Sequence, residues 1–119
     1  MLLRQMTKLR PLLPTLKEKK RYIVFEVLSR QKIGFDAVSK AVMDKSLQFL
    51  GELGVSKAGI HLLPDKYNAE KQKGIMRVNR RHVDSMRAVF ALVNKVDNQE
   101  AIIKSAGVSG ILKKTERFM

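Results

Sequence analysis

Hydrophobic and polar positions near the start of the chain change from a period of two to a period near 3.6. Residues 21–28 are rich in β-branched and aromatic residues and predict a β-strand. Alternate side chains point to opposite faces, and the two sets are Ile23, Phe25 and Val27, and Tyr22, Val24, Glu26 and Leu28. Because both sets are largely apolar, we expect helices to cover one face and a terminal segment or a partner protein to cover the other.

A helical pattern follows this strand. Asp36 can cap a helix that runs to about Leu53, and Gly54 is placed to end it. The apolar stripe of this helix consists of Val38, Val42, Phe49 and Leu53, and it is widened by Met43, Leu47 and Leu50. The pattern therefore predicts an amphipathic helix that packs on the sheet.

The middle of the chain predicts a hairpin and a second helix. Residues 58–63 and 73–78 have the composition of strands, and the segment between them makes a long loop. Asn79 can cap the helix that comes next. The face that this helix buries is formed by Val83, Met86, Phe90 and Val93.

The end of the chain returns to a strand. Asp97-Asn98 is a turn signal that leads into a fourth strand over residues 101–105. Two glycines within residues 107–110 indicate the end of that strand, and residues 111–118 predict a short basic helix.

These elements follow the order β-α-β-β-α-β, which is typical of the split βαβ arrangement. We therefore expect an α+β fold, a ferredoxin-like or RRM-like two-layer sandwich with a four-stranded antiparallel sheet and extra terminal helical segments. The predicted parts are a basic, leucine-bearing arm over residues 1–20, the αβ domain over residues 21–110 and the C-terminal helix over residues 111–119.

Composition identifies the kind of partner. Twenty-four Lys and Arg against eleven Asp and Glu give a net charge of +13, which favours a polyanion as the partner. A hydrophobic content of 45% excludes a wholly disordered basic tail. The chain has no Cys, and no stretch approaches the roughly 20 apolar residues of a membrane span, so we expect a soluble, cytoplasmic protein that binds no membrane.

Catalytic motifs are absent from the sequence. The two histidines, His61 and His82, have no G-x-S-x-G or H-E-x-x-H motif around them, and no phosphate-binding glycine-rich loop occurs. Acidic residues are scattered singly, which does not favour a metal site built from carboxylates. We therefore expect a protein that has no catalytic residues and binds no cofactor.

Cations are concentrated in three segments. Residues 4–21 hold seven cations against one acid, residues 71–87 hold six against one, and the C-terminal segment adds more. Such clusters repel themselves unless a polyanion neutralises them. The candidate RNA-binding residues are Lys17, Lys19, Lys20, Arg21, Lys73, Arg77, Arg80, Arg81, Lys113 and Lys114. The candidate protein-interface residues, from the second apolar face of the first strand, are Tyr22, Val24 and Leu28.

Residues 73–80 can be compared directly with the signature of the RNA-recognition motif, which has the same predicted topology. The segment keeps the Lys, Gly and Val of that signature, but Ile75, Arg77 and Arg80 stand where its aromatic residues belong. Those aromatics stack unpaired bases in that family. Their loss leaves charge and shape, so we expect contacts with the phosphate–ribose backbone of a folded RNA.

Four stretches together are similar to a known family. The segment from Leu13 to Ile23 followed by Phe25 resembles the opening of the archaeal ribonuclease P protein component 2 (Pop-five) family. Family-like stretches continue with Phe49-Leu50-Gly51-Glu52-Leu53-Gly54, Lys73-Gly74-Ile75-Met76-Arg77 and Gly107-Val108-Ser109-Gly110. Leu13 departs from the family pattern, in which a second proline is expected.

The resemblance implies a non-catalytic subunit of a ribonucleoprotein that removes the 5′ leader from precursor tRNA. The RNA of that enzyme cleaves with the help of Mg²⁺, and the protein itself binds no cofactor. Implied partners are ribonuclease P RNA, protein component 3 in a complex with two copies of each protein, and precursor tRNA through the assembled complex. The residues alone leave two alternatives open, a structural RNA-binding protein of the ribosome and a basic module that scaffolds other proteins.

Overall fold

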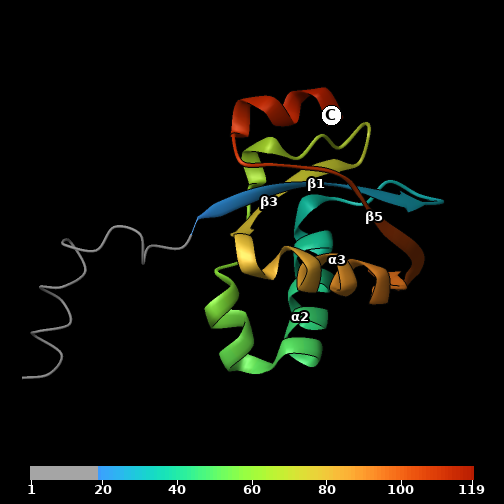
Figure 1. Cartoon of the computed structure of the whole chain (residues 1–119). Helices are drawn as coiled ribbons and strands as arrows, with labels where there is room; N and C mark the ends of the chain where they lie inside the picture. Colours follow the sequence, from blue (N-terminus) through green and yellow to red (C-terminus); the bar gives the residue numbers. More distant parts are fainter. Residues whose placement is uncertain (1–18) are drawn as a thin grey trace, which may run out of the picture.

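The computed structural model describes residues 19–119 and contains one antiparallel sheet between two layers of helices (Figure 1). The strands are β1 (Lys20–Ser29), β2 (His61–Leu62), β3 (Lys73–Asn79), β4 (Lys95–Val96) and β5 (Gln99–Ser109). The α-helices are α2 (Phe35–Ala58) and α3 (Val83–Leu92), and the 3₁₀ helices are η2 (Pro64–Lys66), η3 (Arg80–His82) and η4 (Leu112–Phe118).

The sheet has the strand order β2-β3-β1-β5-β4. Strand β1 lies between β3 and β5, where Ile23 pairs with Met76 on one side and with Val108 on the other. The order β2-β3-β1-β5 confirms the predicted split βαβ arrangement. The predicted number of four strands is wrong, because Lys95–Val96 forms a short fifth strand that pairs with the start of β5 across the Asp97-Asn98 turn. Both turn residues have positive φ, which Asp and Asn tolerate better than most residues.

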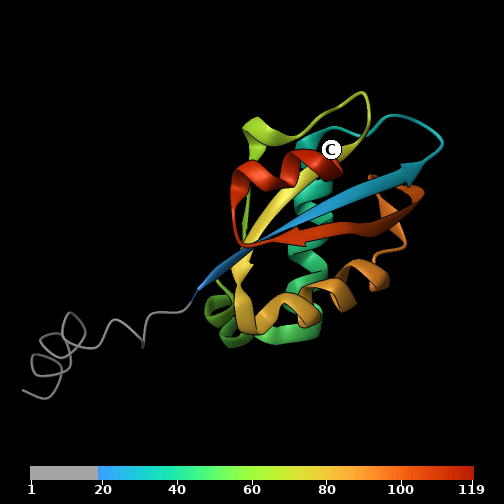
Figure 2. The ribbon, with the colours of Figure 1, turned by 45° about the horizontal axis from the view of Figure 1, so that its top comes forward.

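Both α-helices cover one face of the sheet, as Figure 2 also shows. The predicted inner residues of β1, Ile23, Phe25 and Val27, are buried there. The ring of Phe25 lies 5.6 Å from that of Phe90 in α3, which joins the sheet to that helix. The main core therefore forms on the face that the alternation of β1 predicts.

The opposite face is covered by η4, which lies across the sheet on the side away from α2 and α3 (Figure 1). Val24 and Ile75 are buried on this face, and Thr115 of η4 is buried as well. A Cβ atom at Gly107 would lie 2.5 Å from ring atoms of Phe118, so the glycine gives this ring its place against β5. Of the two covers expected for this face, the structure contains the terminal segment.

Several predicted boundaries are wrong. The helical segment α2 is broken at Gly51 (φ 75°, ψ 172°), two residues before the predicted end at about Leu53, and a second helical stretch continues from there to Ala58. Its C-cap is Gly59 in the left-handed conformation (φ 62°), and Gly54 lies inside the helix. Because Ala58 belongs to the helix, the strand predicted over residues 58–63 is reduced to His61–Leu62.

The second half differs in a similar way. Asn79 occupies the N-cap position of the 3₁₀ turn η3, but its buried side chain makes no capping hydrogen bond, and α3 begins only at Val83. Strand β5 extends to Ser109, so Gly107 lies within the strand that it was predicted to end. The C-terminal helix is present as the 3₁₀ helix η4. The predicted arm over residues 1–20 lies almost entirely outside the described residues.

Candidate nucleic-acid interface

Exposed cations gather where β1 begins and β3 ends. These two strands are antiparallel, so the first residues of β1 lie beside the last residues of β3, and Lys20 pairs with Asn79. The backbone N–H of Arg80 donates a 2.7 Å hydrogen bond to the carbonyl of Lys19, which extends the pairing by one residue. We call this part of the molecule the basic end and define it by Lys19, Lys20, Arg21, Arg80, Arg81 and Arg87.

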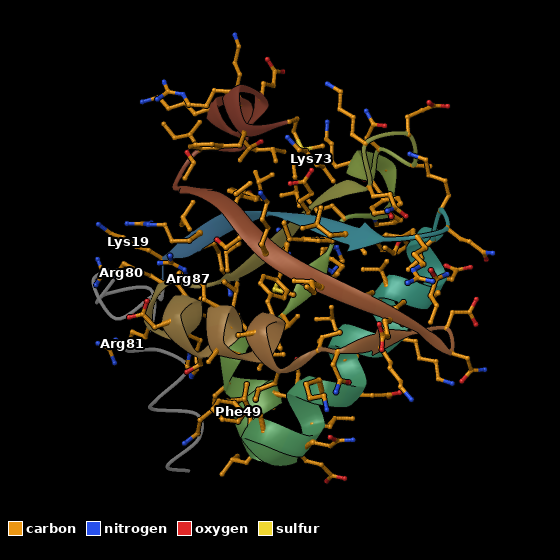
Figure 3. The ribbon with its side chains drawn as sticks, turned by 90° about the vertical axis from the view of Figure 1, so that its right-hand side faces the viewer. Lys19, Phe49, Lys73, Arg80, Arg81 and Arg87 are labelled. Carbon is orange, nitrogen blue, oxygen red and sulfur yellow. The ribbon has the colours of Figure 1, made fainter. Side chains whose placement is uncertain are left out.

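Figure 3 shows Lys19, Arg80 and Arg81 projecting from the same side of the molecule, with Arg87 next to them and Lys73 elsewhere. All four of these grouped side chains are exposed. Among residues 19–119, the one side-chain ion pair joins Lys104 and Glu26 at 3.3 Å. No cation of the basic end is therefore neutralised by a neighbouring carboxylate in the described part of the chain, and its positive field reaches the solvent.

The start of α3 adds to this field. The N-cap residue, His82, makes no side-chain capping hydrogen bond, so the first N–H groups of α3 are not capped by a side chain there. The positive end of the helix dipole thus lies directly after Arg80 and Arg81. Asp84, in the first turn, is the acid that the sequence places nearest to these arginines.

Arg21 and Arg77 are less accessible than the other predicted RNA-binding residues. Arg21 is half-buried and donates from Nη1 to the carbonyl of Lys20 at 3.0 Å. Arg77 is half-buried opposite Tyr22, and its Nε is buried without a hydrogen-bond partner among residues 19–119. Arg21 within the basic end and Arg77 beside it therefore expose less of their surface to an incoming ligand.

Lys113 and Lys114 are exposed on η4, which begins just after β5 ends. Since Ser109 pairs with Tyr22, the start of η4 is near the basic end. A Cβ atom at Gly110 would lie 3.4 Å from Nη1 of Arg21, which also places this connection beside the basic end. The two lysines therefore extend the positive surface toward the η4 side of the sheet.

Lys73 lies at the opposite end of β3, and its ammonium is used within the chain. Its Nζ donates to the carbonyl of Phe118 at 3.1 Å and contacts that of Met119 at 3.5 Å. Lys71 donates to the same Met119 carbonyl at 3.3 Å. The structure thus gives Lys73 a role in holding the end of η4 and separates it from the basic end. Lys17, another predicted RNA-binding residue, lies outside the described residues.

The predicted protein-interface residues meet different surroundings. Val24 is fully buried beneath η4, so it does not face a partner in this conformation. Tyr22 is half-buried. Leu28 is 45% exposed and pairs with Ile102, which is 62% exposed, so these two side chains leave an apolar pair uncovered at the far end of the same face.

Groups that could hold a metal ion are not found in residues 19–119, where no three His, Cys, Asp or Glu side chains lie together. The sequence also did not single out Arg87 as a binding residue, although it was counted in the basic segment 71–87. Its place two turns after Arg80 is the signal that could have been used. No helix within the described part of the chain is long and apolar enough to cross a membrane.

These observations define a class of protein, a small split-βαβ domain whose sheet face is closed by its own C-terminal segment and which has a cluster of exposed cations at one end of the sheet. Comparison with known families gives the particular membership: residues 21–119 match the Rpp14/Pop5 family, and the chain belongs to it. The resemblance stated from the sequence is thereby confirmed.

Individual relatives are consistent with this family membership. The chain is 40% identical over 104 residues to ribonuclease P protein component 2 of Pyrococcus furiosus, which covers 87% of this chain and 85% of the relative. It is 34% identical over 109 residues to the protein of the same name from Methanosarcina acetivorans, with 91% and 80% covered. A chain in the cryo-EM structure of yeast ribonuclease MRP is 12% identical and has a TM-score of 0.62 over 79% of this chain and 76% of the yeast chain, which shows that the fold is shared.

Proposed function

We propose that this chain is a non-catalytic protein subunit of ribonuclease P that binds the catalytic RNA through its basic end and stabilises it for removal of the 5′ leader from precursor tRNA. Membership in the Rpp14/Pop5 family supports the assignment, as do archaeal relatives named ribonuclease P protein component 2. The observation that carries the mechanism is the group of exposed cations at one end of the sheet without carboxylate partners among residues 19–119.

The mechanism is neutralisation of phosphates. Lys19, Arg80 and Arg81 would contact phosphates of RNA helices that pack closely around the catalytic core, which reduces their mutual repulsion. A cation fixed by a protein fold lowers the concentration of Mg²⁺ that the RNA needs for its active geometry. The Mg²⁺ ions themselves would be held by the RNA.

Because η4 closes the sheet face, we expect contact with folded RNA and not with single strands. In RNA-recognition motifs, aromatic side chains on the open sheet face stack unpaired bases. Here that face carries Ile75, buried under η4, and Phe118 lies against Gly107. Binding through the phosphate–ribose backbone at the end of the sheet remains available to such a domain.

The partners follow from the same assignment. We infer that the chain binds ribonuclease P RNA and protein component 3, in a complex with two copies of each protein, and meets precursor tRNA only through this complex. Leu28 and Ile102 are exposed apolar side chains available to a protein partner. No feature of the described residues favours the ribosomal role or the scaffolding role over this assignment.

The test is reconstitution of precursor tRNA cleavage at limiting Mg²⁺, with this chain added or withheld alongside protein component 3. We expect leader removal to need less Mg²⁺ when the chain is present, and no cleavage when the RNA is omitted. An unchanged Mg²⁺ requirement would refute the proposed function, and cleavage without RNA would refute its non-catalytic character.

A further inference from the structure

Within the basic end, Lys20 differs from its neighbours because its ammonium has a partner in the chain. The Nζ of Lys20 donates a hydrogen bond to Oδ1 of Asn79, the residue opposite it in the β1–β3 pairing. Lys19, Lys20 and Arg80 are all exposed and have no ion-pair partner among residues 19–119, and of the three only Lys20 donates to a side chain of the described residues. Adjacent cations in one sequence run therefore have different surroundings.

Asn79 also binds the end of helix α2. Its side chain is only 5% exposed, and its Nδ2 donates a 2.6 Å hydrogen bond to the carbonyl of Lys57 in the last turn of that helix. The last carbonyls of a helix have no partner inside the helix, so this bond satisfies one of them. Because an ammonium only donates and a carbonyl only accepts, the two contacts also fix which atom of the amide is nitrogen and which is oxygen.

Gly59 leaves the room that this arrangement needs. As the C-cap of α2 it has φ 62°, a conformation that glycine adopts without strain. A Cβ atom at this position would lie 3.0 Å from Oδ1 of Asn79 and 3.1 Å from Nζ of Lys20. The ammonium thus lies close to the C-terminal end of α2, where the helix dipole favours a positive charge.

We propose that Lys20 and Asn79 are positioning residues, which we call the Lys20–Asn79 clamp, and that Lys20 is not a phosphate contact. The clamp joins the start of β1, the end of β3 and the end of α2 at one point. Directly beside it, the Arg80 N–H bonds to the Lys19 carbonyl, so the clamp fixes the backbone that presents Lys19, Arg80 and Arg81. This inference rests on the proposed RNA-binding function and revises the sequence-based assignment of Lys20.

The test compares three variants of the full chain, Lys20→Met, Asn79→Ala and the double variant, with Lys19→Met as the matched control. Affinity for transcribed ribonuclease P RNA is measured from about 50 to 200 mM KCl. The temperature is kept well below the thermal unfolding midpoint of every variant. We expect each clamp variant to lose about threefold to tenfold in affinity. The double variant should lose no more than Asn79→Ala alone, because Asn79→Ala already removes the Lys20–Asn79 bond together with the bond to the Lys57 carbonyl.

The slope of log affinity against log salt separates positioning from phosphate contact. Lys19→Met should lower the slope by about 0.7–0.9, the value for one phosphate contact. Lys20→Met and Asn79→Ala should have equal slopes, although only the first removes a charge. The proposal is overturned if the salt slope of Lys20→Met is smaller than that of Asn79→Ala by about 0.7–0.9. It is also overturned if the affinity losses of the two single variants add in the double variant, or if neither single variant changes affinity in the folded protein.

Thermal unfolding gives a second readout that needs no RNA. Each clamp variant should lower the unfolding midpoint by about 4 °C or more, again without additivity in the double variant. Gly59→Ala should lower the midpoint more than Gly51→Ala, because both positions have positive φ but only the Cβ position of Gly59 has Asn79 and Lys20 atoms beside it. If the wild-type chain does not bind ribonuclease P RNA, the proposed function is refuted. If the midpoint shifts of Lys20→Met and Asn79→Ala add in the double variant, the clamp is refuted.

Discussion

The two ends of the sheet differ in whether their polar side chains are bonded to groups of the same chain. At the far end, where β1 finishes and β3 begins, the side chains of Gln72, Lys73 and Tyr67 all bond to groups of the same chain. At the basic end, Lys19, Arg80 and Arg81 point into solvent with no carboxylate partner in residues 19–119. The far end holds several of its polar side chains in hydrogen bonds within the chain, whereas the basic end brings exposed cations of β1, η3 and α3 together, and this difference indicates where a polyanion binds.

Gln72 shows how completely the far end is satisfied. Its side chain is buried, and its Oε1 accepts a 2.5 Å hydrogen bond from the N–H of Ile33. Its Nε2 donates to the carbonyl of Val27 and to Oγ of Ser29, both at 3.1 Å. Tyr67 adds a 2.7 Å bond to the Ile33 carbonyl, and burial raises the pKa of Tyr67, which extends toward higher pH the range in which the phenol can donate this bond.

The largest effect is expected from removing two cations of the basic end. Arg80→Ala with Arg81→Ala should weaken binding to ribonuclease P RNA on the order of a hundredfold at about 50 mM salt, because two phosphate contacts are lost. The matched control is Arg30→Ala with Lys95→Ala, two exposed cations of the far end, which removes the same charge. Filter binding or fluorescence anisotropy measures both. Equal losses from the two pairs would mean that net charge, and not the basic end, determines affinity.

A comparable effect on stability, and none on RNA binding, is expected at the far end. Gln72→Ala removes three hydrogen bonds of a buried side chain and leaves their partners without bonds, which should cost about 2–3 kcal/mol in the free energy of unfolding. Gln48→Ala, at an exposed position of α2, serves as the control and should change it by less than about 0.5 kcal/mol. Urea unfolding measures both. A large loss of RNA affinity by folded Gln72→Ala would contradict the separation of the two ends.

A smaller effect is expected for Lys73, the residue that the sequence assigned to RNA and the structure places at the far end. Lys73→Met should cost about 1 kcal/mol in the free energy of unfolding, because the carbonyls at the end of η4 lose a donor. RNA affinity should stay within about twofold, as for Lys40→Met, an exposed control in α2. A reduced salt slope in Lys73→Met would instead return this residue to the RNA-binding set.

The smallest effect concerns the one ion pair of the described residues. Lys104 is more than half exposed, so its pairing with Glu26 is largely screened by solvent. Lys104→Ala should change the free energy of unfolding by less than about 1 kcal/mol, and urea unfolding at two salt concentrations measures this. A loss well above that value would show that the far end depends on this pair.

How much the sequence predicts depends on the range of the interactions that decide each feature. The inner face of β1, the first half of α2 and the buried face of α3 follow from local periodicity, and the structure confirms them. The stripe predicted for α2 is wrong in its second half, where Phe49 and Leu53 are 51% and 69% exposed. The stop of α2 does not follow from local periodicity, because the chain offers Gly51, Gly54 and Gly59 within nine positions. Only Gly59 meets the Lys20–Asn79 clamp, which joins residues 59 positions apart. Asn79 was misassigned as a helix cap for the same reason.

The candidate site was predicted in part. The clustering of Lys19, Arg80 and Arg81 follows from charge along the chain together with antiparallel pairing of their strands. The internal roles of Lys73 and Lys20 could not be predicted, because their partners, Phe118 and Asn79, are distant in sequence. A count of cations identifies a basic protein but does not say which of the cations are already bound within the chain.

The salt dependence of wild-type binding to ribonuclease P RNA tests the central claim most directly. If about six phosphates are engaged, raising the salt from about 50 to 200 mM should weaken binding on the order of a thousandfold. A nearly flat dependence over the same range would contradict the account, because it would mean that the exposed cations of the basic end do not meet phosphates.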